Sequence, residues 1–203
     1  MRLIENAATL RAMLGEPSAL VPYKIHAQLT AQARAYIAAS PFLLLATADA
    51  KGMPTISPKG DGRGFVHLAD ARTLYLPERK GNRMLISLAN VLENPKVGLI
   101  FLLPRCEETL RISGRASLVD DPALNQRLSA RGSPALLCMR IEIEEVYFHC
   151  AKAFLRSGLW QPETWGEPLK ISFGQEIALR KAMDTAAVNQ LDSEIAARYK
   201  TDL

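Results

Sequence analysis

The amino-acid sequence predicts a mainly β fold, in which one small, mostly antiparallel β-barrel has helices flanking it. Between residues 42 and 150, six or seven short apolar or alternating segments follow one another closely, with turn residues between them. Short helical patterns interrupt these segments without the regular alternation that a parallel doubly wound sheet requires. The chain has 203 residues, of which 48% are hydrophobic, so it is long enough to bury one core.

Two helices are expected ahead of the barrel. Residues 5–14 place Leu10, Met13 and Leu14 on one helical face. Residues 30–39 form a second helical pattern, with Thr30 as its N-cap and Ser40-Pro41 as its end. We therefore expect residues 1–40 to be an N-terminal helical segment within a single domain spanning residues 1–203.

Four strands are expected next. Residues 42–48 are an uncharged apolar run, and residues 54–59 follow after a turn, so the two are expected to form a hairpin. A glycine-rich loop at residues 60–64 leads to a second strand pair, residues 65–68 and 73–76. The barrel is predicted to span residues 41–150.

The rest of the barrel is expected to contain three strands and two short helices. Residues 83–93 have helical spacing, and Asn94 ends this helix because a residue before proline avoids the α region. Strands over 97–103 and 108–118, a helix over 122–130, and a strand over 136–150 follow. Residues 151–170 are expected to be an extended packing segment, and residues 175–199 one terminal helix. That helix is expected to face inward with Ile177, Ala178, Ala182, Ala186, Leu191 and Ile195.

Composition and charge exclude several classes of protein. The net charge is +4, and the Lys and Arg residues are scattered, so no nucleic-acid partner is expected. No apolar run approaches the length of a membrane span, and the N-terminus lacks the pattern of a signal peptide. Cys106, Cys138 and Cys150 form no CxxC pair, so we expect no metal site, no disulfide framework and a cytoplasmic location.

The densest polar cluster lies between an expected strand and an expected helix. It comprises Arg79, Lys80, Asn82 and Arg83, together with Gly81. The first N–H groups of a helix are unpaired and favour an anion, and Arg and Lys hold phosphate through charge-assisted hydrogen bonds. The cluster is therefore either a phosphate site or a solvated loop in which Asn82 is a simple N-cap.

Two strand segments carry further candidate residues. Residues 55–61 include Ser57, Pro58 and Lys59, which either line the mouth of the barrel or form the solvent-exposed face of a hairpin strand. Thr109 and Arg111 lie on one side of a later strand. There Arg111 either reaches a polar ring atom of a cofactor or forms a cross-strand ion pair.

The segment after the last strand contains Lys152, Arg156, Ser157 and Trp160. An aromatic plate with two cations and a hydroxyl suits a flat, partly anionic ring system, and the same residues also suit a packing interface. His149 and Cys150 are adjacent and nothing nearby completes a ligand set, so neither a metal site nor a Cys–His nucleophile is expected. The motifs GxGxxG, GxxxxGK[ST], GxSxG and HExxH are absent, which excludes Rossmann, P-loop, α/β-hydrolase and zincin sites of the usual type.

The order of these features resembles the pyridoxamine 5′-phosphate oxidase-like, FMN-binding split-barrel superfamily, and most of all a bacterial branch of FMN-dependent enzymes. The resemblance covers roughly residues 30–165. It is carried by SPFLLLATAD (40–49), SPKGDGRGFV (57–66), LYLPERKGNRM (74–84), NPKVGLIFLLP (94–104), ETLRISGRA (108–116) and HCAKAFLRSGLW (149–160).

The resemblance implies a six-stranded antiparallel split barrel, a homodimer, and FMN at the dimer interface. It implies that the FMN phosphate lies among Arg79, Lys80, Asn82 and Arg83, and that Ser57, Pro58 and Lys59 lie beside the flavin. Leu76 and Pro77 would run along the isoalloxazine ring, with Thr109 and Arg111 near it. Ser157 and Trp160 would cover the ring from the other subunit, and Lys152 and Arg156 are candidates for contacts to a substrate.

The chain departs from true pyridoxamine 5′-phosphate oxidases in one respect. Those enzymes carry an Arg-x-His substrate clamp near the C-terminus, and this sequence contains no Arg-x-His. We therefore expect an FMN-dependent oxidoreductase of this class that acts on another small molecule. The alternative is a flavin-binding module without turnover, such as a sensor or reservoir. Haem is less favoured because His149 is the one motif-borne axial ligand.

Overall fold

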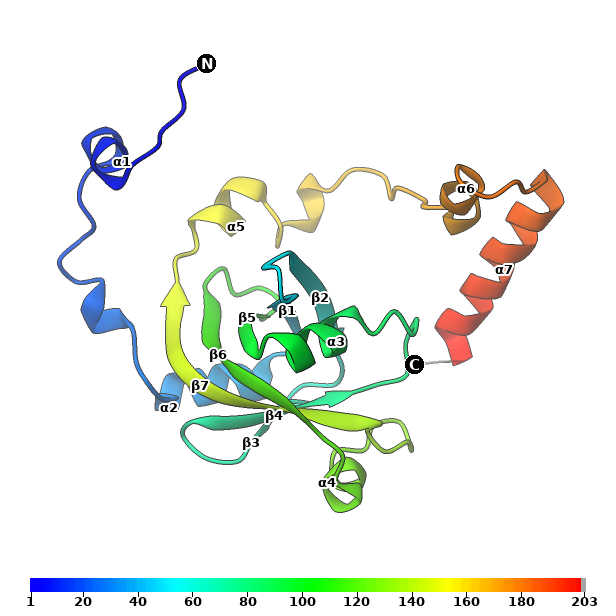
Figure 1. The fold of residues 1–203 in the computed structure, drawn as a ribbon, viewed down its shortest axis with the longest axis horizontal. Coiled ribbons are helices and arrows are strands. Elements are labelled where there is room, and N and C mark those ends of the chain that lie inside the picture. Colours follow the sequence, from blue (N-terminus) through cyan, green and yellow to red (C-terminus); the bar gives the residue numbers. More distant parts are fainter. Residues whose placement is uncertain (202–203) are drawn as a thin grey trace.

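The computed structural model describes residues 1–201 and contains one mainly β, antiparallel sheet (Figure 1). Its seven strands are arranged in the order β2-β1-β5-β6-β7-β4-β3. They are β1 (Phe42–Ala48), β2 (Pro54–Gly60), β3 (His67–Leu68), β4 (Thr73–Glu78), β5 (Lys96–Leu102), β6 (Thr109–Val119) and β7 (Leu137–His149). The predicted class is confirmed. The count exceeds the six strands implied by the resemblance, because the two-residue strand β3 adds to one edge.

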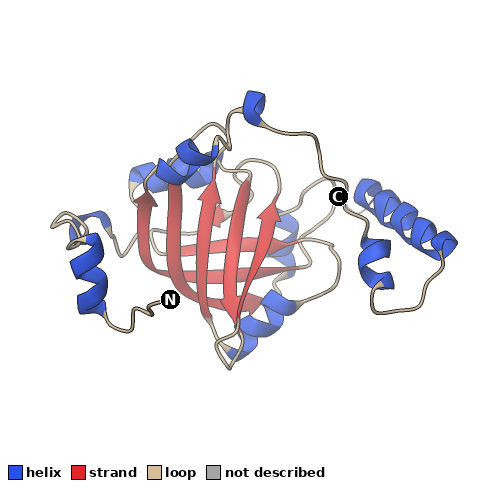
Figure 2. Cartoon of the chain, turned by 90° about the horizontal axis from the view of Figure 1, so that it is seen from above, coloured by secondary structure: helices blue, strands red, loops and turns tan. Residues whose placement is uncertain are grey.

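The sheet curls around one apolar core. Along β1 the side chains alternate, and Leu43 and Leu45 are fully buried while their neighbours are half-buried. β6 and β7 pair along almost their whole lengths, with a register shift at Ser113 and Gly114 that bends the pair. Figure 2 shows the strands crossing in two layers, with helices around their margins.

Three helices lie against or beside the barrel. Thr30 caps α2 (Ala31–Ala39), as predicted, by accepting a hydrogen bond from Ala33 N at 3.1 Å. α2 contributes Ala33, Tyr36 and Ile37 to the core. α3 (Ile86–Glu93) packs on β1 and β6, and α4 (Pro122–Arg127) begins at its N-cap Asp121.

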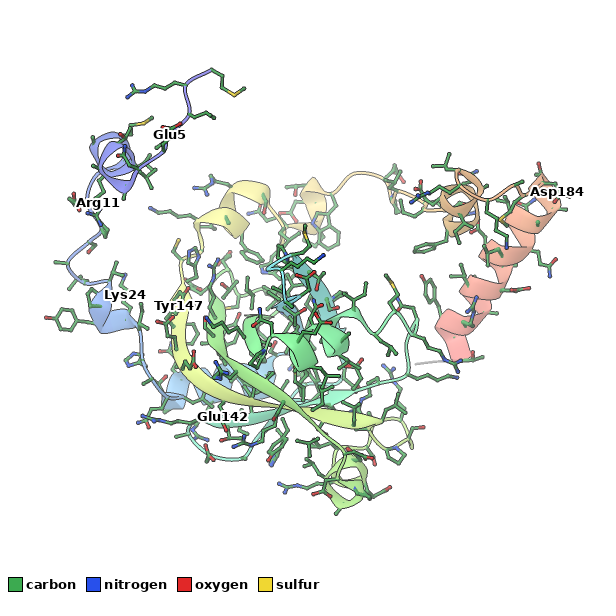
Figure 3. All side chains as sticks on the ribbon, viewed as in Figure 1. Glu5, Arg11, Lys24, Glu142, Tyr147 and Asp184 are labelled. Carbon is green, nitrogen blue, oxygen red and sulfur yellow. The ribbon has the colours of Figure 1, made fainter. Side chains whose placement is uncertain are left out.

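The chain before α2 and after β7 forms two arms (Figure 1). The first carries α1 (Ala7–Leu14) and the short turn η1 (Pro22–Lys24). The second carries α5 (Lys152–Ser157), η2 (Pro162–Thr164), α6 (Phe173–Ala178) and α7 (Thr185–Thr201). α6 packs on α7, and Figure 3 shows Asp184 at the far end of this pair, while Glu5 and Arg11 lie on the first arm. None of the residues of α1 or α7 is buried.

The structure corrects three expectations about the C-terminal region. Residues 151–170 are not simply extended, because α5 and η2 form there. Residues 175–199 are two helices and not one, since Asp184 accepts a hydrogen bond from Ala187 N at 2.8 Å and starts a new helix there. The expected inward face is also wrong, because Ile177 is 43% exposed and no residue of α7 is buried. Among residues 1–201, no helix has both the length and the apolar character that a membrane crossing needs.

Candidate functional site

The candidate site lies where β2 and β4 approach each other without backbone pairing. These strands stand far apart in the order of the sheet, yet Lys59 Nζ of β2 lies 2.6 Å from Glu78 Oε2 of β4. Just beyond them, Arg79 Nε lies 2.8 Å from Asp61 Oδ2. Two ion pairs therefore close the barrel where hydrogen bonds between strands are absent, and we call this line of contact the seam.

Proline explains why the seam stays unpaired. Pro58 in β2 and Pro77 in β4 have no N–H to donate, so each suits a strand edge. β3 pairs with β4 only at Leu74 and Tyr75, which leaves the later part of β4 open on that side. Pro58 within one expected strand, and Pro77 directly after the expected strand 73–76, were signals in the sequence for this open edge.

Two connected cavities, of about 330 and 400 Å³, lie along the seam. Both are lined by Ser57, Pro58, Lys59, Glu78, Arg79, Lys80, Gly81 and Asn82. Pro77 lines the first cavity and Arg83 the second. The structure thus brings two predicted groups together, the residues around Ser57 and the cation cluster, in a space whose size is typical of a small-molecule site.

The N-terminus of α3 opens onto the larger cavity. Ile86, Ser87 and Leu88 form the first turn and line the cavity, and the N-cap residue Leu85 provides no side-chain cap. The helix was expected from residue 83, but it begins at Ile86. Leu85 has a φ of +57°, which an α-helix does not allow. Asn82 consequently accepts from Met84 N, at 3.1 Å, and does not cap the helix.

The charges in the cavity are partly compensated by the chain itself. Lys59 is paired with Glu78, and Arg79 is paired with Asp61. The positive charge of each cation is therefore balanced by a carboxylate. Arg79 also donates to the Leu128 carbonyl at 2.7 Å, which fixes its position. Neither carboxylate could be identified from the sequence as a partner, because each pair spans the closed seam.

A buried thiol lies close to Arg79 but outside the cavities. Cys138 is fully buried, and its Sγ lies 3.5 Å from Asn125 Oδ1. Burial raises the pKa of the Cys138 thiol, and the positive charge of Arg79 opposes that rise only in part. Cys138 is therefore a neutral core residue and not a nucleophile of the site.

A polar network holds β2 against α3. The buried Asn90 side chain donates to Thr47 Oγ1 at 3.0 Å and to Thr55 Oγ1 at 3.1 Å. The two threonine hydroxyls lie 2.9 Å apart. This network fixes the start of β2 and hence the position of Ser57, whose hydroxyl has no hydrogen-bond partner among the described residues.

Apolar side chains form the other side of the larger cavity. Ile56, Met84, Leu85 and Leu136 line it and are more than 60% exposed. Sequence reasoning missed this wall, because these residues come from three separate segments. Cations and open N–H groups on one side and apolar side chains on the other suit a ligand with an anionic tail and a flat apolar body.

Several predicted residues lie elsewhere. Leu76 is 1% exposed and belongs to the core, so it lines neither cavity. Thr109 is also buried, at the start of β6. Trp160 donates from Nε1 to the Cys106 carbonyl at 2.9 Å and stacks on Phe154. Ser157 bonds to the Phe154 carbonyl at 3.1 Å. Lys152 and Arg156 are exposed on α5.

Arg111 lies on the outer face of the sheet. The strand register aligns Pro58, Leu44, Ile100, Arg111 and Tyr147 across five neighbouring strands, so they share one face. That face is opposite the core, which contains Leu43, Leu99 and Leu110. Arg111 Nε is buried without a hydrogen-bond partner among the described residues, so the cross-strand ion pair considered for it is not formed there. The outer face thus carries half-buried apolar residues and one unsatisfied donor.

Comparison with known proteins supports a family assignment for the barrel. The sequence model of the pyridoxamine 5′-phosphate oxidase family matches residues 29–150. No curated protein sequence matches the chain. Within residues 1–201, no group of three or more His, Cys, Asp or Glu residues is placed to hold a metal ion.

Three solved structures similar to this chain each cover more than half of it. HupZ of Group A Streptococcus is 23% identical with a TM-score of 0.48, and the match covers 59% of this chain and 93% of that one. An FMN-binding protein of Syntrophomonas wolfei is 16% identical with a TM-score of 0.47, covering 58% and 83%. HutZ, the heme storage protein of Vibrio cholerae, is 16% identical with a TM-score of 0.38, covering 58% and 89%.

Proposed function

Because the chain belongs to the pyridoxamine 5′-phosphate oxidase family, we propose that it binds FMN in the cavities along the seam and acts as an FMN-dependent oxidoreductase. One observation supports this most strongly. The uncapped N-terminus of α3 and the cation cluster open onto the same cavity, whose other side is apolar. The donors fit a phosphate, and the apolar wall fits an isoalloxazine ring.

Each part of the cavity would have its own task. Arg83, Asn82 and the first N–H groups of α3 would hold the phosphate, together with Lys80. Ser57 would offer its hydroxyl to a polar edge of the flavin, and Pro58 and Ile56 would contact the ring. FMN, when bound, supplies hydride and electron transfer at its ring, which the side chains of this chain cannot provide themselves.

We further propose that the protein is a homodimer joined through the outer face of the sheet. Leu44 and Ile100 lie at the centre of this face, and Pro58 connects it to the cavity. A second copy would bury the apolar residues and could satisfy Arg111 Nε. The partner's α5 segment would then bring Ser157, Lys152 and Arg156 to the ring, whereas the Trp160 indole N–H is already bonded to Cys106.

The test begins with the visible absorption spectrum of the full-length protein mixed with FMN. We expect flavin peaks shifted by binding, which bleach on addition of NADPH or NADH and return in air. Bound flavin that no reductant bleaches would contradict an oxidoreductase and support the binding module. If the spectrum of FMN is unchanged by the protein, the proposed site is wrong.

A further inference from the structure

Two more cavities continue from the seam on the far side of Arg79. One, of about 450 Å³, is lined by Arg79, Lys80, Arg131 and Ser133 among others. The other, of about 260 Å³, is lined by Arg63, Arg79, Arg127 and Ser129 among others. We call these two the arginine cavities. They adjoin the proposed FMN site because Arg79 lines the seam cavities as well.

The arginine cavities carry an excess of positive charge. Arg63, Arg127 and Arg131 are exposed, and the guanidinium group of none of them has a hydrogen bond or ion pair within residues 1–201. The carboxylate that lines both cavities, Asp61, is already paired with Arg79. Three arginines without an anionic partner in the described part of the chain therefore line these cavities, Arg131 the first, and Arg63 and Arg127 the second.

The loop that carries Arg131 is held in place. Ala130 and Ser133 exchange two backbone hydrogen bonds of 2.9 Å, which close a tight turn around Arg131 and Gly132. Arg79 donates to the Leu128 carbonyl at the start of this loop. The same residue thus joins the loop to β4, and the position of the arginine cavities relative to the seam is set by the fold.

We propose that the arginine cavities are a second anion subsite, which binds the pyrophosphate of a dinucleotide. A guanidinium group forms paired hydrogen bonds with phosphate oxygens, and three of them exceed what one monophosphate at the N-terminus of α3 requires. This inference rests on the proposed function for the position of the first phosphate. Two ligands share the required chemistry: a flavin dinucleotide bound in place of FMN, and a nicotinamide dinucleotide bound beside it.

Calorimetric titration of the full-length protein with inorganic pyrophosphate tests the subsite directly. We expect Arg131→Ala to weaken pyrophosphate binding at least about tenfold, the loss typical of one charged hydrogen-bond pair. Arg72→Ala is the matched control, since this exposed arginine precedes β4 at the end away from the seam. Arg63→Ala provides a second test if the Arg131 variant does not fold. Equal affinities in the arginine variant and the control would overturn the proposal.

Titrations with dinucleotides distinguish the two ligands that could supply the pyrophosphate. Loss of FAD affinity in Arg131→Ala apoprotein points to a flavin dinucleotide, and loss of NADPH affinity in its FMN-loaded form points to a nicotinamide dinucleotide. If neither dinucleotide responds to the substitution, the proposal is wrong. A parallel FMN titration separates the two conclusions. Arginine-dependent pyrophosphate binding without FMN binding would refute the proposed function alone, and FMN binding without arginine dependence would refute the subsite alone.

Discussion

Arg79 and Arg83 show how two neighbouring cations can have different tasks. Arg79 bonds to the Asp61 carboxylate and the Leu128 carbonyl, so it serves first to hold the seam and the following loop together. Arg83 has no such partner within residues 1–201 and lines the larger cavity. Arg79 therefore has a structural role, whereas the Arg83 side chain is available to bind a ligand.

This difference predicts opposite effects of two substitutions. Arg83→Ala should weaken FMN binding about tenfold or more with little change in stability, because it removes a ligand contact from an exposed position. Arg79→Ala should lower the free energy of unfolding by about 1–3 kcal/mol, because it leaves the largely buried Asp61 carboxylate unpaired.

Flavin titration and urea unfolding of both variants, with Arg72→Ala as control, measure the two effects. The assignment of roles would be wrong if Arg79→Ala unfolded like the wild type, or if Arg83→Ala bound FMN as tightly.

At the scale of single residues, the sequence predicted the members of the cation cluster but not their pairing. Arg79, Lys80, Asn82 and Arg83 are consecutive or nearly so, and any compact fold brings them together. Glu78 and Asp61 acquire their partners only when β2 and β4 meet, which depends on the curvature of the whole sheet. Local patterns contain no information about that approach.

At the scale of elements, β6 and β7 depend on one glycine at their bulge. A Cβ on Gly114 would lie 2.1 Å from the Glu142 carbonyl oxygen, whereas one on Gly98 in β5 would meet Ala46 Cβ at an ordinary 3.8 Å. The backbone of β7 approaches β6 so closely at this point that only glycine fits.

Gly114→Ala should therefore destabilise the protein by about 1–3 kcal/mol or more, as overpacking usually does, and Gly98→Ala should cost clearly less. Thermal or urea unfolding of the two variants checks this. Equal losses of stability would show that the bulge is not under this constraint.

The helix pair at the C-terminus is expected to depend on pH through Asp192. Hydrogen bonds from Ser172 and from the backbone N–H of Gly174 hold the pKa of Asp192 below its ordinary value of 3.8. A lowered carboxylate pKa stabilises the folded form above the unfolded value, and this stabilisation is lost as the pH falls through the lowered value.

We expect α6 and α7 to stay paired from neutral pH down to about pH 4, near the reference pKa of Asp, and to loosen below it. NMR shifts of Gly174 and Val188 across that range report the contact. Asp192→Asn should remove the pH dependence, and a dependence that persists in this variant would assign it to another group.

Strands were easier to predict than the C-terminal helices, for a physical reason. β1 was predicted with its observed bounds, because a short, uncharged apolar run between turn residues is compatible with little except a buried strand. The terminal helices were predicted as one, because their apolar residues keep a helical period through the break. The Asp184 side chain accepts a hydrogen bond from Ala187 N and starts a new helix, although the apolar period continues across this point.

At the scale of the whole molecule, the proposed dimer depends on the outer face of the sheet. In the described part of the chain its central residues Leu44 and Ile100 are half-buried. Figure 2 shows a broad face of the sheet over which no helix lies. A charge placed there would be buried without a partner at the proposed interface. Its desolvation would offset much of the free energy of association of a dimer of ordinary size.

Leu44→Asp is therefore expected to convert a dimer into a monomer, as measured by light scattering on a sizing column. Leu3→Asp, at a position 73% exposed on the first arm, is the control and should leave the mass unchanged. A wild-type protein that is already monomeric would refute the dimer, and a dimeric Leu44→Asp would move the interface to another surface.

The seam gives the barrel one line along which it can open without losing any of its sheet. Everywhere else, separating two strands breaks a ladder of backbone hydrogen bonds, but β2 and β4 are joined only through side chains. Transient opening there admits solvent to β2 first, so its amides should exchange hydrogen for deuterium sooner than those of β6. A ligand that spans the seam would hold β2 and β4 together and slow this exchange. Slower exchange of the β2 amides would therefore report ligand binding at the seam.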